Sequence, residues 1–193
     1  MIDKGAEAKI YAVDIFGKEV LAKERTHKNY RIRELDEKIR EMRTKNEARI
    51  ILAANKSGIN APKLIATGKY TLFISRIQGK LLRDSEESVR DGVELGRQLA
   101  LLHDADIAHG DFTPANVMVS KGEIAIIDFG LSEITTSIEE KAIDLHLMKR
   151  SAGKAFYLTF SRSYAKHSKN AKQVIARLED IEKRGRYQNR TLS

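Results

Sequence analysis

The sequence predicts an α+β fold in two lobes, with a β-rich N-terminal lobe over residues 1–76 and a reduced, mostly helical C-terminal lobe over residues 77–193. Three observations predict it. Short apolar runs separated by glycine turns dominate the first part, helical apolar patterns follow residue 88, and a hairpin pattern separates two acidic positions. With 193 residues, 41% of them hydrophobic, the chain can bury a sizeable core.

The N-terminal strands are predicted from short runs in which apolar and β-branched residues recur between turn residues. Lys23 ends one of these runs, so its ammonium group extends from the end of an apolar strand. The predicted strands are Ile10–Asp14, Glu19–Lys23, Lys63–Thr67 and Thr71–Ser75, with turns at Phe16–Lys18 and Gly68–Tyr70.

A helix is expected to begin at Thr44-Lys45-Asn46-Glu47, which has the T-x-x-E form of a capping box. It would end at Gly58, because glycine readily takes the left-handed conformation found at helix ends. The charged stretch before it, Lys28–Arg43, is interpreted as a solvated helix or a mobile loop.

Three further helices are predicted in the C-terminal lobe. The apolar residues between Ser88 and Asp104 form a broad helical surface, which is typical of a core helix. The sequence Ser137–Glu140 has the form of another helix cap. The last helix is expected over Ser168–Lys183, with Gly185 as its end.

The segment from residue 109 to residue 130 carries residues suited to phosphoryl transfer. Asp111 in His109-Gly110-Asp111 offers a carboxylate that can lie beside an incoming hydroxyl or water. Asn116 and Asp128 offer the hard oxygen donors that Mg²⁺ prefers. The apolar hairpin between them, with its turn at Lys121-Gly122, would return Asp128 to the neighbourhood of Asp111.

This order and spacing resemble the catalytic loop and the D-F-G motif of protein kinases. Either tripeptide alone is a common turn sequence, so the prediction depends on the whole set. The set predicts a minimal two-lobed protein-kinase-like fold with a kinase-type ATP site, and His109 is expected to be structural. The helix cap at Ser137 leaves no room for an activation segment after Gly130.

The kinase resemblance implies roles for residues of the N-terminal lobe. Lys23 would contact the α and β phosphates of ATP, and Glu47 is the favoured acidic partner for it. Glu34, Glu37 and Glu41 remain alternative partners for Lys23.

Other parts of the chain resemble the remaining kinase elements less closely. Gly5-Ala6-Glu7-Ala8 would be a reduced phosphate-covering loop, since the usual glycine-rich turn is missing. The backbone of Arg76 and Ile77 would form the hinge to which adenine binds. Asp144 either holds the backbone of the catalytic loop or is a surface acid of an amphipathic helix.

Composition restricts the classes of protein and of metal site. The chain has no cysteine, which excludes disulfides and thiolate metal sites, and its five histidines lack zinc spacing. No apolar run is long enough to span a membrane and no signal pattern opens the chain, so a cytoplasmic protein is expected. Residues 145–193 hold 12 Lys or Arg against 3 Asp or Glu, a basic excess that fits an RNA backbone, an acidic protein surface or a solvated helical face.

Over nearly its whole length, the chain resembles the small atypical kinase or ATPase subunit of the KEOPS complex, which supports threonylcarbamoylation of adenosine 37 in tRNA. This resemblance implies ATP and Mg²⁺ as cofactors, Asp111 as base, and Asn116 and Asp128 as metal ligands. It also implies a threonylcarbamoyl-transferase subunit and a small regulatory subunit as partners, and the basic C-terminal tail is expected to contact tRNA. The residues that carry the resemblance are Gly5–Ala8, Lys23, Tyr30-Arg31, Leu35-Asp36, Arg43-Thr44, Glu47-Ala48, His109–Asp111, Asn116, Ile127–Leu131, Glu140–Ala142, Asp144-Leu145 and the basic end.

The chain departs from that family at Phe112–Ala115, where Leu-Thr-Thr-Ser is common, and at Ile32-Arg33, where His-Pro is usual. Two other kinds of kinase share part of the pattern: small-molecule kinases, and kinases of the RIO type that also lack an activation segment. A scaffold that binds nucleotide or partners without catalysis is the alternative from a different class. Nucleotide binding separates a partner-only scaffold from the others.

Overall fold

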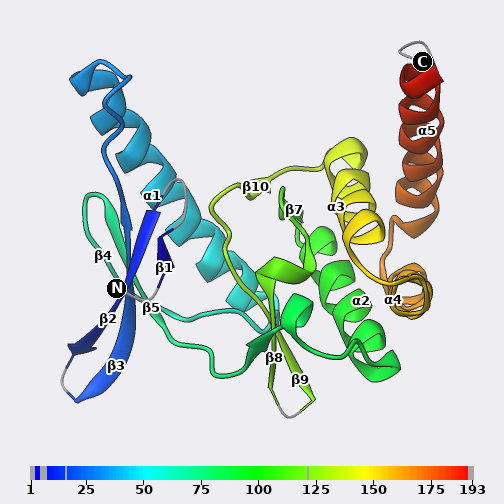
Figure 1. Ribbon diagram of the computed structural model, residues 1–193, viewed down its shortest axis with the longest axis horizontal. Helices are drawn as coiled ribbons and strands as arrows, with labels where there is room; N and C mark the ends of the chain where they lie inside the picture. The colour runs from blue at the N-terminus through cyan, green and yellow to red at the C-terminus, as the bar shows by residue number, and fades with distance from the viewer. Residues whose placement is uncertain (1–2, 5–7, 16, 121, 191–193) are drawn as a thin grey trace.

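The computed structural model describes residues 3–4, 8–15, 17–120 and 122–190, and it confirms the predicted fold class. Figure 1 shows a strand-rich lobe on the left and a mostly helical lobe on the right, with the long helix α1 running diagonally from the first toward the second. No helix among the described residues combines the length and apolar character needed to cross a membrane.

The N-terminal lobe is a five-stranded antiparallel sheet in the order β1-β2-β3-β5-β4. Lys23 lies opposite Ile10 on one neighbouring strand and opposite Leu72 on the other, so its backbone is fixed from both sides. The predicted hairpin of β4 and β5 is confirmed. The strands are β1 (Asp3–Lys4), β2 (Ala8–Ile15), β3 (Lys18–Arg25), β4 (Leu64–Thr67) and β5 (Thr71–Ser75).

Helix α1 spans Arg33–Lys56, so the predicted capping box at Thr44–Glu47 is wrong. Thr44 lies inside the helix, where its hydroxyl donates to the carbonyl of Arg40 at 2.8 Å. Ion pairs four residues apart, such as Arg33–Glu37, favour the helical form of the charged stretch that precedes it. The helix ends before Gly58, whose φ of 79° confirms the expected left-handed stop.

The C-terminal lobe confirms the core helix after Ser88, the central hairpin and the helix capped by Ser137. The Ser88 and Ser137 side chains accept hydrogen bonds from the backbone N–H groups of Asp91 and Glu140. Its elements are β6 (Lys80–Leu81), η1 (Leu82–Asp84), α2 (Val89–Asp104), β7 (Ile107–Ala108), η2 (Pro114–Asn116), β8 (Val117–Ser120), β9 (Glu123–Ile126), β10 (Glu133–Ile134), α3 (Ile138–Ser151), α4 (Lys154–His167) and α5 (Ala171–Arg190).

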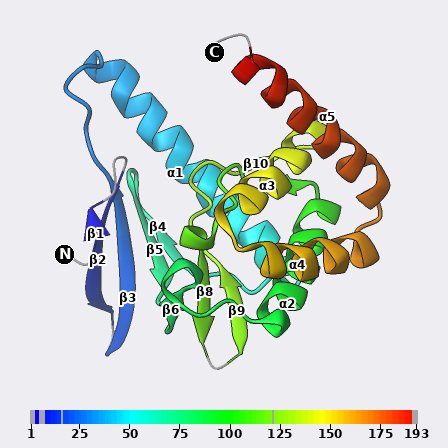
Figure 2. The same cartoon turned by 45° about the vertical axis from the view of Figure 1, so that its right-hand side comes forward.

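Helix α4 packs against α2 at very close range, and Figure 2 shows it lying across the front of the C-terminal lobe over α2. The close approach depends on Gly92 and Gly96 of α2, where an added Cβ would collide with the Thr159 hydroxyl and the Phe160 carbonyl of α4. The sequence analysis did not predict α4, although its buried residues Phe156, Phe160 and Tyr164 recur at helical spacing.

Helix α5 continues through Gly185 to Arg190, so the predicted end at Gly185 is wrong. A glycine inside a helix costs only about 1 kcal/mol relative to alanine. Its neighbours Lys183, Arg184 and Arg186 are good helix formers, which outweighs one unfavourable residue. The basic residues near the C-terminus therefore belong to a helix over most of their length.

Candidate active site

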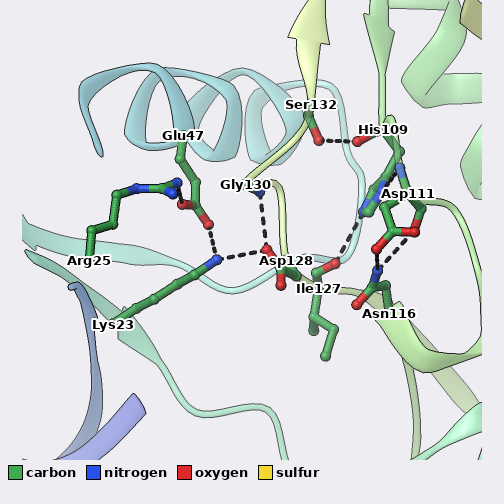
Figure 3. A network of polar contacts seen from close by, with 10 residues as sticks. All are labelled: Lys23, Arg25, Glu47, His109, Asp111, Asn116, Ile127, Asp128, Gly130 and Ser132. Atoms are coloured by element: carbon green, nitrogen blue, oxygen red, sulfur yellow. Dashed lines mark hydrogen bonds and ion pairs between the residues drawn. The ribbon is translucent and has the colours of Figure 1, made fainter. Parts of the chain in front are cut away.

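Lys23, Glu47 and Asp128 meet where the sheet, helix α1 and the end of the central hairpin come together (Figure 3). The Lys23 ammonium group donates to Glu47 Oε1 at 2.6 Å and to Asp128 Oδ1 at 2.7 Å. The expected pairing of Lys23 with Glu47 is thus confirmed, and it needs Glu47 in the middle of α1 rather than at a helix start.

The electrostatics keep the Lys23 ammonium group and the Asp128 carboxylate charged in this arrangement. Burial acts to lower the pKa of Lys23, but the carboxylates of Glu47 and Asp128 outweigh it, so the pKa is raised. Burial acts to raise the pKa of Asp128, yet the Lys23 ammonium and the Gly130 N–H lower it. The site therefore presents a permanent cation beside an ionised carboxylate, as binding of nucleotide phosphates and a metal requires.

Arg25 is a second cation on Glu47 that the sequence reasoning missed. It lies two residues after Lys23 on β3, so both side chains point to the same face of the sheet. Its Nη2 donates to Glu47 Oε2 at 2.6 Å, and both side chains are buried. Glu47 thus binds Arg25 with one oxygen and Lys23 with the other, which fixes the position of α1 against the sheet. The two-residue spacing is the signal that would have found it.

Asp111 and Asn116 form a second group at the catalytic loop (Figure 3). The Asn116 side-chain nitrogen donates to the Asp111 backbone carbonyl at 2.8 Å and to Asp111 Oδ2 at 2.9 Å. Because the amide nitrogen is committed to Asp111, the amide oxygen is the Asn116 atom suited to a metal ion. The interaction also orients the Asp111 carboxylate.

His109 connects the catalytic loop to the segment that carries Asp128. Its Nε2 lies 3.1 Å from the Ile127 carbonyl, and its Nδ1 accepts from the backbone N–H of Asp111 at 3.3 Å. A carbonyl can only accept, so Nε2 carries the proton in this arrangement. The ring is fully buried against Phe112 and Phe129, which confirms the predicted structural role of His109.

The backbone at Asp128 has a φ of 60°, which is uncommon for a residue other than glycine. Aspartate tolerates this left-handed conformation better than most residues. The conformation lets Asp128 Oδ1 accept from the Gly130 N–H at 3.1 Å.

The remaining predicted site residues lie at the edges of this centre. Ala8 begins β2 and is buried, whereas Gly5, Ala6 and Glu7 lie outside the described residues. Arg76 and Ile77 follow β5 in the segment that leads to the C-terminal lobe, and the Arg76 guanidinium group pairs with Glu19 on β3.

Comparison with known proteins agrees with the kinase-like arrangement of these residues. A family model described as the RIO domain matches residues 7–149. The KEOPS complex subunit Bud32 of Pyrococcus abyssi is 35% identical, over 99% of this chain and 97% of the relative. The chain belongs to the Bud32 family of RIO-domain proteins.

Two other matches add to this assignment. A probable bifunctional tRNA threonylcarbamoyladenosine biosynthesis protein from Methanobrevibacter smithii is 36% identical over 97% of this chain, which spans 36% of that relative. The Rio2 kinase from Chaetomium thermophilum, solved as an ADP/Mg²⁺-phosphoaspartate complex, superimposes with a TM-score of 0.66 at 18% identity, over 97% of this chain and 70% of that chain. That likeness shows the fold.

The donor set of this RIO-domain chain fits a magnesium ion. Asp128 supplies a carboxylate and Asn116 an amide oxygen, and both are hard donors of the kind that Mg²⁺ takes. Protein sites for Mg²⁺ commonly use one or two side chains together with substrate phosphates, so two protein ligands are sufficient.

Asp144 of α3 holds the backbone of the RIO-domain catalytic loop, the first of its two expected roles. Its two oxygens accept from the N–H groups of His109 at 2.7 Å and Gly110 at 2.9 Å, and the carboxylate is fully buried. His103 of α2 lies behind it, with Nε2 3.1 Å from Asp144 and Nδ1 2.8 Å from the Tyr164 hydroxyl. Burial lowers the pKa of His103, so the neutral ring donates to Asp144 and accepts from Tyr164.

Replacing Asp144 by alanine is expected to lower the free energy of unfolding by about 3 kcal/mol or more, because three buried donors lose their acceptor. Urea unfolding followed by circular dichroism measures the change. Asp180→Ala, at an exposed acid of α5, is the matched control and should stay within about 0.5 kcal/mol of wild type. A similar small change for Asp144→Ala would contradict the proposed support of the loop.

The connection after Gly130 is short in this member of the family, since α3 begins at Ile138. Ser132 ties this connection on both sides: its hydroxyl donates to the His109 carbonyl at 2.8 Å, and its own carbonyl accepts from Asn46 of α1 at 3.2 Å. Asn46, which precedes Glu47 in α1, is therefore linked to the catalytic loop through Ser132.

Proposed function

We propose that the chain is a Mg²⁺-ATP-dependent phosphotransferase or ATPase of the atypical serine/threonine kinase type. As a subunit of the KEOPS complex, it would support threonylcarbamoyladenosine formation at position 37 of tRNA in the cytoplasm. The observation that carries the catalytic part is the joint placement of two groups, Lys23–Glu47–Asp128 and Asp111–Asn116, linked through His109. A single short motif that occurred by chance would not bring these two groups together.

In this proposal, each residue of the two groups has a defined role. Lys23, oriented by Glu47, binds the α and β phosphates of ATP, and Asp128 and Asn116 bind Mg²⁺. The metal neutralises charge on the transferring phosphoryl group. Asp111 accepts the proton of the attacking hydroxyl or water, with Asn116 holding its carboxylate in place.

Two other segments of the chain would bind the adenine and cover the phosphates. The backbone of Arg76 and Ile77 binds adenine at the boundary that we place between lobes 1–76 and 77–193. Residues Gly5–Ala8 cover the phosphates as a reduced loop.

The proposed partners follow from the relatives. One relative is named as a KEOPS subunit. Another is a single bifunctional polypeptide in which this chain corresponds to 36% of the length, so the rest of that protein is physically joined to a domain like this one. We take these as support for binding to the threonylcarbamoyl-transferase subunit, with small regulatory subunits in the same complex and tRNA near the basic C-terminal part.

The proposal is tested by isolating the chain from native extract, identifying the proteins that accompany it, and measuring ATP hydrolysis with and without them and tRNA. We expect ATP binding by the chain alone and turnover that increases with the partner. ATP binding without any turnover would identify a nucleotide-binding scaffold. Phosphorylation of an added small-molecule substrate in place of partner-dependent turnover would identify a small-molecule kinase.

A further inference from the structure

The basic excess of the chain is concentrated in the folded C-terminal lobe. Residues 145–178 contain 8 Lys or Arg and no Asp or Glu, whereas the residues beyond Gly185 contribute only Arg186 and Arg190. The acid-free stretch covers the end of α3, all of α4 and the start of α5. Most of the positive charge is therefore displayed on described helices, well before the end of the chain.

Two of these eight cations are used within the protein. Lys149 pairs with Glu182 at 2.6 Å, and Arg177 pairs with Glu139. Within the described part of the chain, the other six are exposed and form no ion pair. We call them the α4 basic surface: Arg150, Lys154, Arg162, Lys166, Lys169 and Lys172.

Three of the six cations share the exposed side of α4, and the other three flank the helix in sequence. Lys154, Arg162 and Lys166 lie on the exposed side of α4, opposite the buried Phe160 and Tyr164 that face α2. Arg150 lies just before α4, and Lys169 and Lys172 lie just after it. In Figure 2, α4 lies in front of α2, and short connections join it to the end of α3 and to the start of α5.

Two acids contact the chain at the two ends of α4, and both have partners there. Glu87 accepts from the Gly153 N–H at 3.0 Å at the start of α4. Asp104 accepts from the Lys169 N–H at 3.1 Å and from the Ser168 hydroxyl at 3.2 Å at its end. Both carboxylates bind the backbone at helix ends, where they replace missing helical partners. The side-chain cations between them are left for an external anion.

We propose that the α4 basic surface binds the phosphate backbone of RNA. This inference rests on the proposed function in tRNA modification, and it assigns the contact to α4 and its flanks rather than to the tail beyond Gly185. RNA is favoured over an acidic protein because Leu158 is the one large apolar side chain exposed on α4. Protein interfaces centre on aromatic and apolar residues, whereas nucleic-acid interfaces are strongly positive.

The test measures binding of unmodified tRNA by fluorescence anisotropy at several salt concentrations. In the triple variant Lys154→Gln, Arg162→Gln, Lys166→Gln, we expect affinity at about 0.1 M salt to fall roughly tenfold, because three phosphate contacts are lost. The slope of log affinity against log salt should decrease by roughly 2 to 3 for the same reason. The melting temperature should not change, since all three side chains are exposed.

Two further proteins make the result specific. The control triple Lys18→Gln, Lys56→Gln, Lys63→Gln removes the same charge from exposed positions outside the surface, and a chain ending at Arg184 removes the tail. Both should bind tRNA nearly as wild type does. Unchanged affinity of the α4 triple, an equal loss in the control triple, or a loss confined to the shortened chain would each overturn the inference. So would a triple that keeps tRNA binding but loses a protein partner.

ATP binding is measured on the same preparations, because it separates this inference from the proposed function. A wild-type chain that binds tRNA through α4 but fails to bind Mg²⁺-ATP would contradict the proposed function and leave the surface assignment standing. A chain that binds Mg²⁺-ATP but no tRNA would contradict the surface assignment and leave the proposed function standing.

Discussion

Asp128→Asn is expected to lower Mg²⁺-ATP turnover on the order of a thousandfold, while the protein stays folded. The change removes the anionic metal ligand and one of the two carboxylates beside Lys23. Lys23 keeps its ion pair with Glu47, so no buried ammonium group is left without a partner. Asparagine also tolerates the left-handed backbone at this position, where φ is 60°, better than alanine would.

Steady-state ATP hydrolysis measures the loss for Asp128→Asn, and a thermal melt checks the fold. Asp84→Asn, at an exposed acid of the same type, is the control and should retain full turnover. Turnover of purified Asp128→Asn at the wild-type level would refute the assignment of this centre as a kinase-type site.

Asp111→Asn is expected to reduce the rate by about a hundredfold or more, with the dissociation constant for ATP changed little. The substitution removes the proton acceptor, but an amide oxygen can still accept from the Asn116 side chain that now binds Oδ2 at 2.9 Å. Single-turnover kinetics together with equilibrium nucleotide binding separate the two quantities. A parallel loss of nucleotide affinity would make Asp111 a binding residue.

The catalytic segment could be predicted because its information is local. Asp111, Asn116 and Asp128 lie within eighteen consecutive residues, and two short apolar runs joined by a turn at Gly122 indicate the hairpin between them. The local sequence alone could not identify Glu47, since four glutamates between residues 34 and 47 were candidates for pairing with Lys23. Only the packing of α1 on the sheet, to which Arg25 contributes, distinguishes Glu47 from the rest.

The errors came from reading single local signals as boundaries. Thr44-x-x-Glu47 has the letters of a helix start, yet ion pairs before it extend the helix back to Arg33. Gly185 has the identity of a helix end, but good helix formers surround it. The support of the catalytic loop by His103 and Tyr164 joins residues that are distant in the chain, and no spacing rule predicts it.

The close packing of α4 on α2 fixes the distance between α4 and the catalytic loop that follows α2. Gly92 and Gly96 leave no space for α4 to slide, and α2 leads within a few residues to Asp111. Packed helix axes are separated by roughly 8–10 Å, a spacing that side-chain motion does not change. A ligand bound on the outer side of α4 would therefore lie at a constant distance from the Asp111 carboxylate. Only a part of that ligand that spans this distance could contact Asp111.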